Sequence, residues 1–164
     1  MITLKHILVA TDFSEAADAA FAYGRELART FGASLDVLHV VENIYARLAV
    51  DGFVTSEANL QRELEEHTRN RLNEILCDED RALLHAKPVI LVSEAPAIAI
   101  ATYARENRVD LIIMGTHGRS GVAHFLMGSV AERVVRIASC PVLTVRHPER
   151  EFVLPDALVA TARA

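Results

Sequence analysis

Residues 114–130, MGTHGRSGVAHFLMGSV, bring several glycines together directly after the apolar run Val109–Met114. Glycine allows positive φ values and lets an anion approach the backbone without a Cβ in the way. Inward-pointing amides at the start of a helix can bind phosphate without a cationic side chain. The segment therefore predicts a phosphate site built largely of backbone, although glycines also gather in loops for turn geometry alone.

The spacing of these glycines excludes two common phosphate-binding motifs. A P-loop needs GxxxxGK[ST], but the chain has two lysines, Lys5 and Lys87, and neither lies here. The dinucleotide motif GxGxxG is also absent, because the segment reads GxxGxxG. Ser129 could donate its hydroxyl to a phosphate, or it could form a capping box with Glu132.

A second group of candidate residues follows the first apolar run of the chain. Thr11 and Asp12 come directly after Ile7–Ala10, where a buried strand should end. Asp12 could help to hold Mg²⁺, which prefers oxygen ligands. It could instead cap the next helix, although Ser14 is already a good N-cap. A receiver domain is excluded because Ser93, and not a phosphoacceptor aspartate, follows the third apolar run.

The other candidate side chains favour structural roles. His117 and His124 match no familiar zinc pattern, and we interpret them as polar loop residues. His39 lies within an apolar run and is interpreted as a packed core histidine. Arg119 could contact a terminal phosphate or be solvated. No arrangement typical of a Ser-His-Asp triad is found around Ser129, so the sequence predicts no catalytic residue.

Apolar runs alternate with helical patterns along the chain. The runs predict strands at residues 6–11, 34–41, 87–92, 109–114 and 141–145, and helical spacing predicts helices at 14–31, 56–77, 96–107 and 129–139. The apolar side of the second helix is expected to consist of Leu60, Leu64, Leu72 and Leu76. This alternation predicts an α/β domain whose parallel sheet is covered on both faces. Ligands in such folds bind at the C-terminal ends of the strands.

Composition narrows the function further. The 164 residues suit a single domain, and the net charge of −5, with no basic cluster, does not favour nucleic-acid binding. Glu94 and Pro96 interrupt the longest apolar stretch, so no membrane span is expected. No secretory signal is visible, and Cys77 and Cys140 form no CxxC pair, so we expect a cytoplasmic protein with reduced thiols. The domain is expected at 1–147 and a tail at 148–164.

Together these motifs resemble those of the universal stress protein family. The pattern Gly115-x2-Gly118-x9-Gly128-Ser129 is similar to the nucleotide-binding signature of that family. Residues 7–14, 38–40 and 139–145 are similar to its opening strand, the end of its second strand and its closing strand. The resemblance covers residues 3 to 146. One departure is Glu94, which stands where relatives often have glycine.

The resemblance implies a three-layer, Rossmann-like fold with five parallel strands in the order 3-2-1-4-5. It also implies a homodimer through the last strand, where Val142, Leu143 and Val145 would make contact. Members with the complete glycine signature bind ATP, so the resemblance implies ATP, or ADP or AMP, together with Mg²⁺. The residues it assigns to the nucleotide site are Ala10, Thr11, Asp12, Val40, Met114, Gly115, Gly118, Arg119, Gly128, Ser129 and Val130.

Within this set the resemblance implies particular roles. The backbone of Val40 would meet adenine, with Ala10 and Thr11 lining the same pocket, and Met114 and Gly115 would border the ribose. Asp12 would lie near the ribose or the metal. The phosphates would be held by Gly118, Gly128, Ser129 and Val130, with Arg119 and Ser120 in a variable part of the loop.

Three functions remain open from the sequence. The first is an ATP-binding regulator of a stress response, whose bound nucleotide changes the glycine loop or the dimer. The second is a slow ATPase, since the loop offers no lysine and no second carboxylate to support fast phosphoryl transfer. The third is a dimeric partner-binding module with a vestigial nucleotide site.

Overall fold

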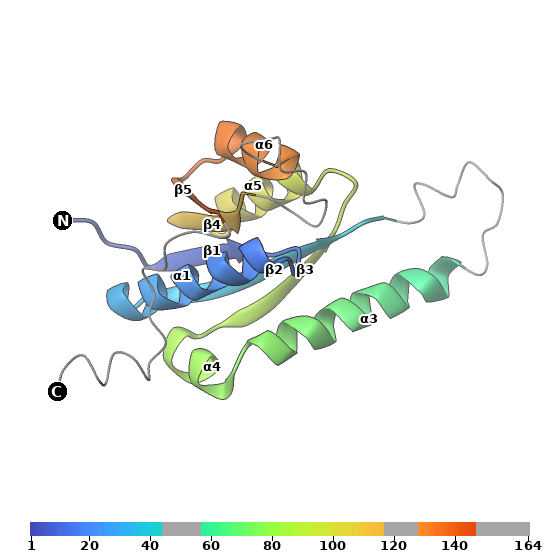
Figure 1. Cartoon of the computed structure of the whole chain (residues 1–164), viewed down its shortest axis with the longest axis horizontal. Coiled ribbons are helices and arrows are strands. Elements are labelled where there is room, and N and C mark those ends of the chain that lie inside the picture. Colours follow the sequence, from blue (N-terminus) through green and yellow to red (C-terminus); the bar gives the residue numbers. More distant parts are fainter. Residues whose placement is uncertain (44–56, 117–127, 147–164) are drawn as a thin grey trace.

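A computed structural model describes residues 1–43, 57–116 and 128–146 of the chain (Figure 1). Along the chain the elements are β1 (His6–Ala10), α1 (Glu15–Phe31), β2 (Ser34–Val41), α3 (Glu57–Ile75), α4 (Asp78–Leu84), β3 (Lys87–Val92), α5 (Pro96–Glu106), β4 (Leu111–Gly115), α6 (Ser129–Ile137) and β5 (Val142–Val145). All five predicted strands are present, and their ends match the predicted bounds to within two residues.

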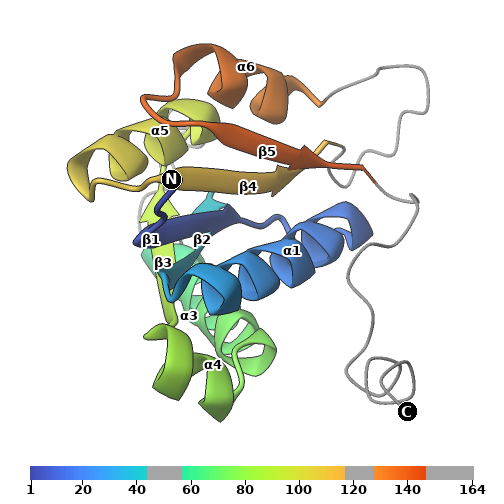
Figure 2. The same ribbon diagram turned by 90° about the vertical axis from the view of Figure 1, so that its left-hand side faces the viewer.

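The strands form one parallel sheet in the order β3-β2-β1-β4-β5 (Figure 2), which confirms the predicted order. From β1 the chain winds outward to β2 and β3, and it then returns to the other side of β1 for β4 and β5. Ala10 is in register with Leu38 on β2 and with Met114 on β4. The end of β1 therefore lies beside Leu38 and Met114, close to the ends of β2 and β4 and to the point where the winding reverses.

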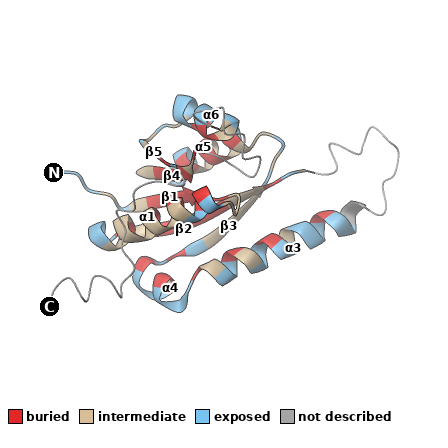
Figure 3. Ribbon diagram, viewed as in Figure 1, coloured by how far each residue is buried: buried red, intermediate tan, exposed pale blue. Residues whose placement is uncertain are grey.

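Helices cover both faces of the sheet, and each face has its own apolar core (Figures 1 and 2). Ile7 and Val9 of β1 pack with α1, α3 and α4, whereas Leu8 packs with α5 and α6. Successive side chains of a strand point to opposite faces, so β1 is buried on both sides. Figure 3 shows buried residues on both the strands and the helices, and the outer strand β3 is mostly intermediate. Burial on both faces explains why the strands lack an alternating pattern.

The charged helix predicted at 56–77 is confirmed as α3, whose ends match the predicted bounds to within two residues, whereas α4 was not predicted. α3 ends at Ile75, and Cys77 precedes α4 as its N-cap rather than lying within a helix. The fully buried carboxylate of Asp80 accepts the amide of Cys77 at 3.2 Å and the Arg25 guanidinium at 2.8 Å. This bond back to the amide of Cys77 competes with continuing the helix, and Arg25 of α1 holds the carboxylate in place.

The apolar side of α3 also differs from the prediction. Leu72 and Leu76 are buried, but Leu60 and Leu64 are 45% and 37% exposed. The predicted positions repeat every four residues, whereas an α-helix has 3.6 residues per turn. Four such steps rotate the side chain by about 160°, so the line drifts off the packed face.

The end of α1 agrees with simple chain chemistry. Gly32 ends α1 with φ of 65°, the left-handed conformation expected of a glycine after a helix. Cys77 and Cys140 are free thiols. None of the described helices is both long enough and apolar enough to cross a membrane.

A buried carboxylate lies toward the other end of the sheet, on the α5 face. Asp36 is 1% exposed, and it accepts the Tyr103 hydroxyl at 2.7 Å, with His6 Nε2 at 2.8 Å and Lys87 Nζ at 3.6 Å. Burial opposes its ionisation, but the bonds from His6 and Tyr103 outweigh burial and hold the pKa of Asp36 below its ordinary value. The same hydrogen bond raises the pKa of His6.

Candidate functional site

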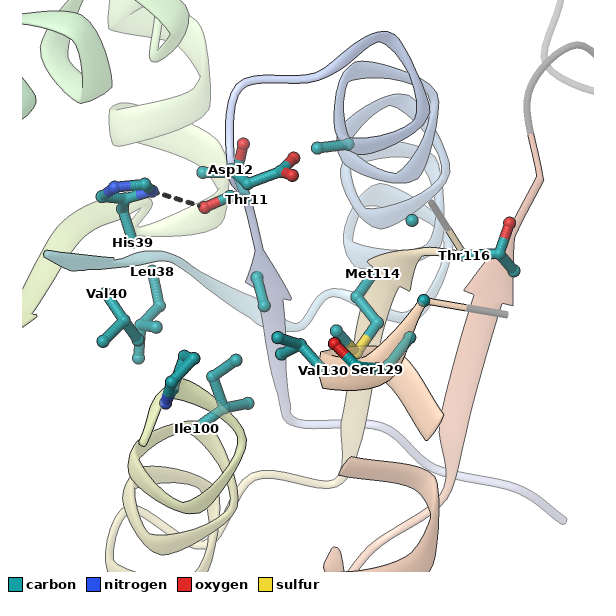
Figure 4. Close-up of a pocket in the computed structure, with 16 residues that line it drawn as sticks. Thr11, Asp12, Leu38, His39, Val40, Ile100, Met114, Thr116, Ser129 and Val130 are labelled. Atoms are coloured by element: carbon teal, nitrogen blue, oxygen red, sulfur yellow. Dashed lines mark hydrogen bonds between the residues drawn. The ribbon is translucent and has the colours of Figure 1, made fainter. Parts of the chain in front are cut away.

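A cavity of about 300 Å³ lies where the C-terminal ends of β1, β2 and β4 meet the starts of α5 and α6 (Figure 4). This is the point at which the winding of the sheet reverses, where ligands bind in doubly wound folds. The predicted site residues on its wall are Ala10, Thr11, Asp12, Val40, Met114, Gly115, Gly128, Ser129 and Val130. Gly118 and Arg119 lie outside the described residues, as do Ser120, His117 and His124.

The first turn of α6 reaches the cavity without a side-chain cap. Gly128 is the N-cap, with φ −67° and ψ 149°, and Ser129 is the first residue of the helix. The capping box considered for Ser129 and Glu132 is therefore wrong, and Glu132 instead pairs with Arg136 at 2.8 Å. The first-turn amides of a helix have no intrahelical acceptor, and the helix dipole favours an anion beside them. The arrangement suits a phosphate or carboxylate.

Both ends of the segment between β4 and α6 are fixed. The carbonyl oxygen of Thr116 accepts the amide of Gly128 at 2.5 Å, and the amide of Thr116 donates to Val145 on β5 at 2.8 Å. Thr116 is buried and lines the cavity, although the sequence analysis did not select it. Nothing in its residue type marked it, since its contribution here is made through the backbone.

Gly115 has a packing role in addition to its place on the wall. A Cβ built on this residue would lie 2.9 Å from the carbonyl carbon and from the Cβ of Ala16 in α1. Such distances are shorter than van der Waals contact, so β4 and α1 approach this closely only because residue 115 is glycine. One glycine of the predicted phosphate-binding segment, Gly115, is therefore needed for the packing of α1 on β4.

Asp12 does not cap α1. Its Oδ1 accepts the Ser14 amide at 3.1 Å and the Ser14 hydroxyl at 2.5 Å. Ser14 is the N-cap, and its Oγ accepts the Ala17 amide at 3.3 Å. Asp12 thus stands on the cavity wall with its carboxylate held by the turn, in a position to meet a cation or a hydroxyl group.

His39 also lines the cavity, so its interpretation as a packed core histidine was wrong. Its Nδ1 lies 2.7 Å from the Thr11 carbonyl oxygen. Because a carbonyl oxygen only accepts hydrogen bonds, Nδ1 carries the proton that it donates. The sequence held one usable signal, because β2 ends at the same edge of the sheet as β1, which Asp12 follows.

The start of α5 completes the apolar part of the wall with Pro96 and Ile100. Glu94, the departure from the family pattern, is exposed and its φ is not positive. A side chain is therefore tolerated at that position without backbone strain. Leu38 and Ala131 add further apolar surface to the cavity.

Fold and cavity together define an α/β protein with a cavity at the switch point of its sheet. The family model described as the universal stress protein family matches residues 3–146. The chain belongs to the universal stress protein family. Universal stress protein MJ0577 of Methanocaldococcus jannaschii is 31% identical over 158 residues, which cover 89% of this chain and 97% of that protein. A universal stress protein of Thermus aquaticus is 36% identical over 144 residues, covering 87% and 98%.

Solved structures show the same fold. The universal stress protein UspA from Lactobacillus plantarum superposes with a TM-score of 0.73 at 25% identity, covering 89% of this chain and 100% of that one. A universal stress protein in complex with cAMP gives a TM-score of 0.57 at 23% identity, covering 88% and 98%. The universal stress protein from Archaeoglobus fulgidus in complex with dAMP gives 0.55 at 20% identity, covering 88% and 99%.

Proposed function

We propose that the cavity binds an adenine nucleotide, ATP with Mg²⁺ or else ADP or AMP, and that the protein is a nucleotide-dependent regulator in a stress response. The observation that carries the proposal is the uncapped first turn of α6, which opens on the same cavity as the Asp12 carboxylate. The first turn of α6 suits an anion, and the Asp12 carboxylate suits a cation or a hydroxyl group. A nucleotide offers both, as its phosphates and as its ribose or bound metal.

The cavity divides into parts that suit the parts of a nucleotide. Leu38, Val40 and Ile100 lie together on one side, and Ser129 and Val130 lie on another (Figure 4). We assign adenine to the apolar side, where the backbone of Val40 can recognise its edge. The phosphates are assigned to the amides that open α6.

Several predicted contacts remain part of the proposal. Gly118 and Arg119 are assigned to the phosphates from the family signature, and Met114 and Gly115 to the ribose. Mg²⁺ would take Asp12 as a protein ligand and would draw further oxygens from the phosphates. The described residues hold no group of three or more His, Cys, Asp or Glu side chains suited to a metal ion. The ion would accordingly bind together with the nucleotide.

Relatives support the adenine assignment. Two family members of the same fold were solved with adenine nucleotides, one with cAMP and one with dAMP. Both ligands share the adenine base and a phosphate, which are the two groups assigned above to the apolar side and to α6. The homodimer through β5 and the cytoplasmic location remain predictions from the sequence.

We place the function in regulation rather than in fast hydrolysis. Asp12 is the one carboxylate on the described cavity wall, and no lysine or arginine lies there. Phosphoryl transfer needs a metal, a positioned nucleophile and stabilisation of the developing charge. Bound nucleotide would instead shift the protein between states, as far as it prefers one of them. Single-turnover hydrolysis that exceeds the Asp12→Ala background would favour the ATPase alternative.

The test is calorimetric titration of the Gly128→Val variant with MgATP. Valine at this position is compatible with the backbone, but its methyl groups would occupy the phosphate position. We expect binding to weaken by at least about 100-fold, because hydrogen bonds to a charged group contribute up to about 3 kcal/mol.

Ala138→Val is the matched control, since Ala138 ends the same helix with φ −64° and ψ 144°, nearly the conformation of Gly128. The control should bind as the wild type does. Equal affinity in Gly128→Val and Ala138→Val would refute the phosphate assignment, and wild-type protein that binds no adenine nucleotide would refute the function.

A further inference from the structure

Three side chains, from α3, from β2 and from the turn between β1 and α1, form a column beside the cavity. The guanidinium carbon of Arg71, on α3, lies 4.0 Å from the centroid of the Phe13 ring. The Phe13 ring in turn packs on His39 at the end of β2, with centroids 4.7 Å apart and planes inclined by 35°. Both distances lie in the range of attractive cation–π and ring contacts. We refer to these residues as the Arg71–Phe13–His39 stack.

Phe13 has an unusual backbone. Its φ is 61°, in the left-handed region that bulky residues rarely adopt. Its amide donates to the Thr11 hydroxyl oxygen at 3.0 Å. A strained conformation of this kind persists only where the surrounding structure holds it. The stack supplies that hold, because the Phe13 ring contacts both Arg71 and His39.

The strained residue lies next to Asp12 in the turn between β1 and α1. On one side of Asp12, the Thr11 carbonyl accepts the Nδ1–H of His39 at 2.7 Å (Figure 4). On the other side, Phe13 is fixed by the stack, and Ser14 binds the Asp12 carboxylate. Asp12 is therefore placed by contacts with β2 and with α3, in addition to those of its own turn.

We propose that Arg71 and Phe13, which are not part of the described cavity wall, are positioning residues that set the Asp12 turn and thereby the affinity of the site for Mg²⁺-nucleotide. This inference depends on the proposed function and deepens it, because it makes α3 part of the nucleotide site. A shift of α3 that separates Arg71 from Phe13 releases the turn, and nucleotide binding favours the state in which they stay stacked.

A double-mutant cycle of Arg71→Met with Asp12→Asn tests the route through Asp12. Methionine keeps an unbranched chain in the helix and removes the guanidinium. We expect Arg71→Met to weaken MgATP binding about fivefold in the wild type and less than about twofold in Asp12→Asn, because residues that act as one unit are not additive. An unchanged affinity, or the same factor in both backgrounds, overturns the inference.

Phe13→Leu and Phe21→Leu form a matched pair. Phe21, on α1, carries the Arg25 guanidinium at 4.6 Å from its ring centroid, so each variant removes one Arg–Phe contact. Leucine at position 13 bears the same backbone strain as phenylalanine and lacks only the ring. Phe13→Leu should bind MgATP about fivefold more weakly, and Phe21→Leu should bind as the wild type does. Equal effects of the two variants overturn the inference.

Phe13→Gly separates the ring from the strain, because glycine accepts φ of 61° freely. Because this variant releases the turn, it should bind MgATP at least as weakly as Phe13→Leu does. Wild-type affinity in Phe13→Gly overturns the inference, since the backbone conformation alone would then suffice.

A structure of Arg71→Met without nucleotide decides the inference independently of binding. We expect Phe13 to leave the left-handed region or the Asp12–Ser14 hydrogen bonds to break, and an unchanged turn overturns the inference. If Arg71→Met does not fold, Arg71→Lys takes its place, because an ammonium group lacks the planar stacking surface. Wild-type protein that binds no MgATP would refute the proposed function, and this structure would still decide the role of the stack.

Discussion

The two ends of the sheet use polar residues in different ways. Toward the amino end, polar groups pair with one another. Asp36 is enclosed by His6, Tyr103 and Lys87, and the carboxylate of Asp110 accepts the amides of Lys5 and His6 at 2.7 Å and 3.0 Å. At the carboxyl end, Asp12 and the first turn of α6 border a cavity. The surroundings of a polar group, other protein groups or a cavity, therefore indicate whether it contributes to stability or to binding.

This contrast separates stability from binding. A buried polar group that loses its partner costs the free energy of desolvating that group. A polar group on a cavity wall can be matched by a ligand instead. Substitutions toward the amino end should accordingly change the free energy of unfolding and leave nucleotide affinity alone, whereas most of those at the cavity should do the reverse.

Asp36→Ala should have the largest effect. It removes a buried carboxylate and leaves the hydroxyl of Tyr103 and the ring of His6 without that partner. We expect the free energy of unfolding to fall by about 3 kcal/mol, measured by urea denaturation. MgATP affinity of the folded protein should be unchanged. A large loss of affinity with little loss of stability would break the comparison.

Gly115→Ala should have the next largest effect, and it marks a limit of the comparison. The residue lines the cavity, but its added Cβ would meet the backbone of Ala16 at 2.9 Å. Forced repacking of this kind costs about 2 kcal/mol of stability, readable from the same urea curves. If the variant proves as stable as the wild type, the close approach of α1 and β4 is not what requires glycine.

His6 gives the amino end a dependence on pH. The hydrogen bond to Asp36 raises the pKa of His6 above 6.5, and burial opposes that rise. The stabilisation is therefore complete below pH 6.5 and is lost as pH rises through the higher pKa of the folded protein. We expect the advantage of wild type over His6→Gln, about 1 kcal/mol at pH 6, to shrink toward alkaline pH in denaturation curves. An advantage that grows with pH would contradict the assignment.

The same pair responds to acid in the opposite sense. The pKa of Asp36 in the folded protein lies below its ordinary 3.8, because the bonds from His6 and Tyr103 outweigh the effect of burial. Its contribution is present above pH 3.8 and is lost as pH falls through the lowered pKa. His6→Gln and the wild type should then converge in strong acid, which gives the pH series an internal check.

Ser129→Ala should have the smallest effect. Ser129 is exposed at the first position of α6 and does not cap the helix, so stability should hardly change. Loss of one hydroxyl donor to phosphate should weaken MgATP binding by about threefold, measured by calorimetry. A clear loss of stability with unchanged MgATP binding would instead indicate that Ser129 caps α6, contrary to the structure.

Much of the fold could be predicted because the pattern of each element is local. Apolar runs and helical spacing gave all five strands and most helix bounds. The short helix α4 was not predicted, because its first turn is fixed by Asp80, whose partner Arg25 lies 55 residues away. Leu60 and Leu64 were misassigned because a repeat of four residues does not follow the turn of a helix.

The candidate site shows the same division between local and distant information. Residues at the end of a strand or just after it, such as Met114 and Asp12, were found because strand ends converge at one edge of a parallel sheet. His39 and Thr116 were missed, because their places depend on contacts with Thr11 and with Gly128 and Val145. Ser129 changed role because the geometry of Gly128 decides where α6 begins.

The sequence by itself determined the order of the strands along the chain, four of the helices, and the segments that meet at the carboxyl edge of the sheet. These follow from periodicity and from glycine, which act over a few neighbouring residues, and the resemblance of the motifs to a known family added the family itself. Only the tertiary structure decided that Gly115 packs on α1, that Asp36 is enclosed, and that Arg71 reaches Phe13. Each of these joins residues far apart in the chain, and such a contact has no local signature because it exists only when both partners are folded.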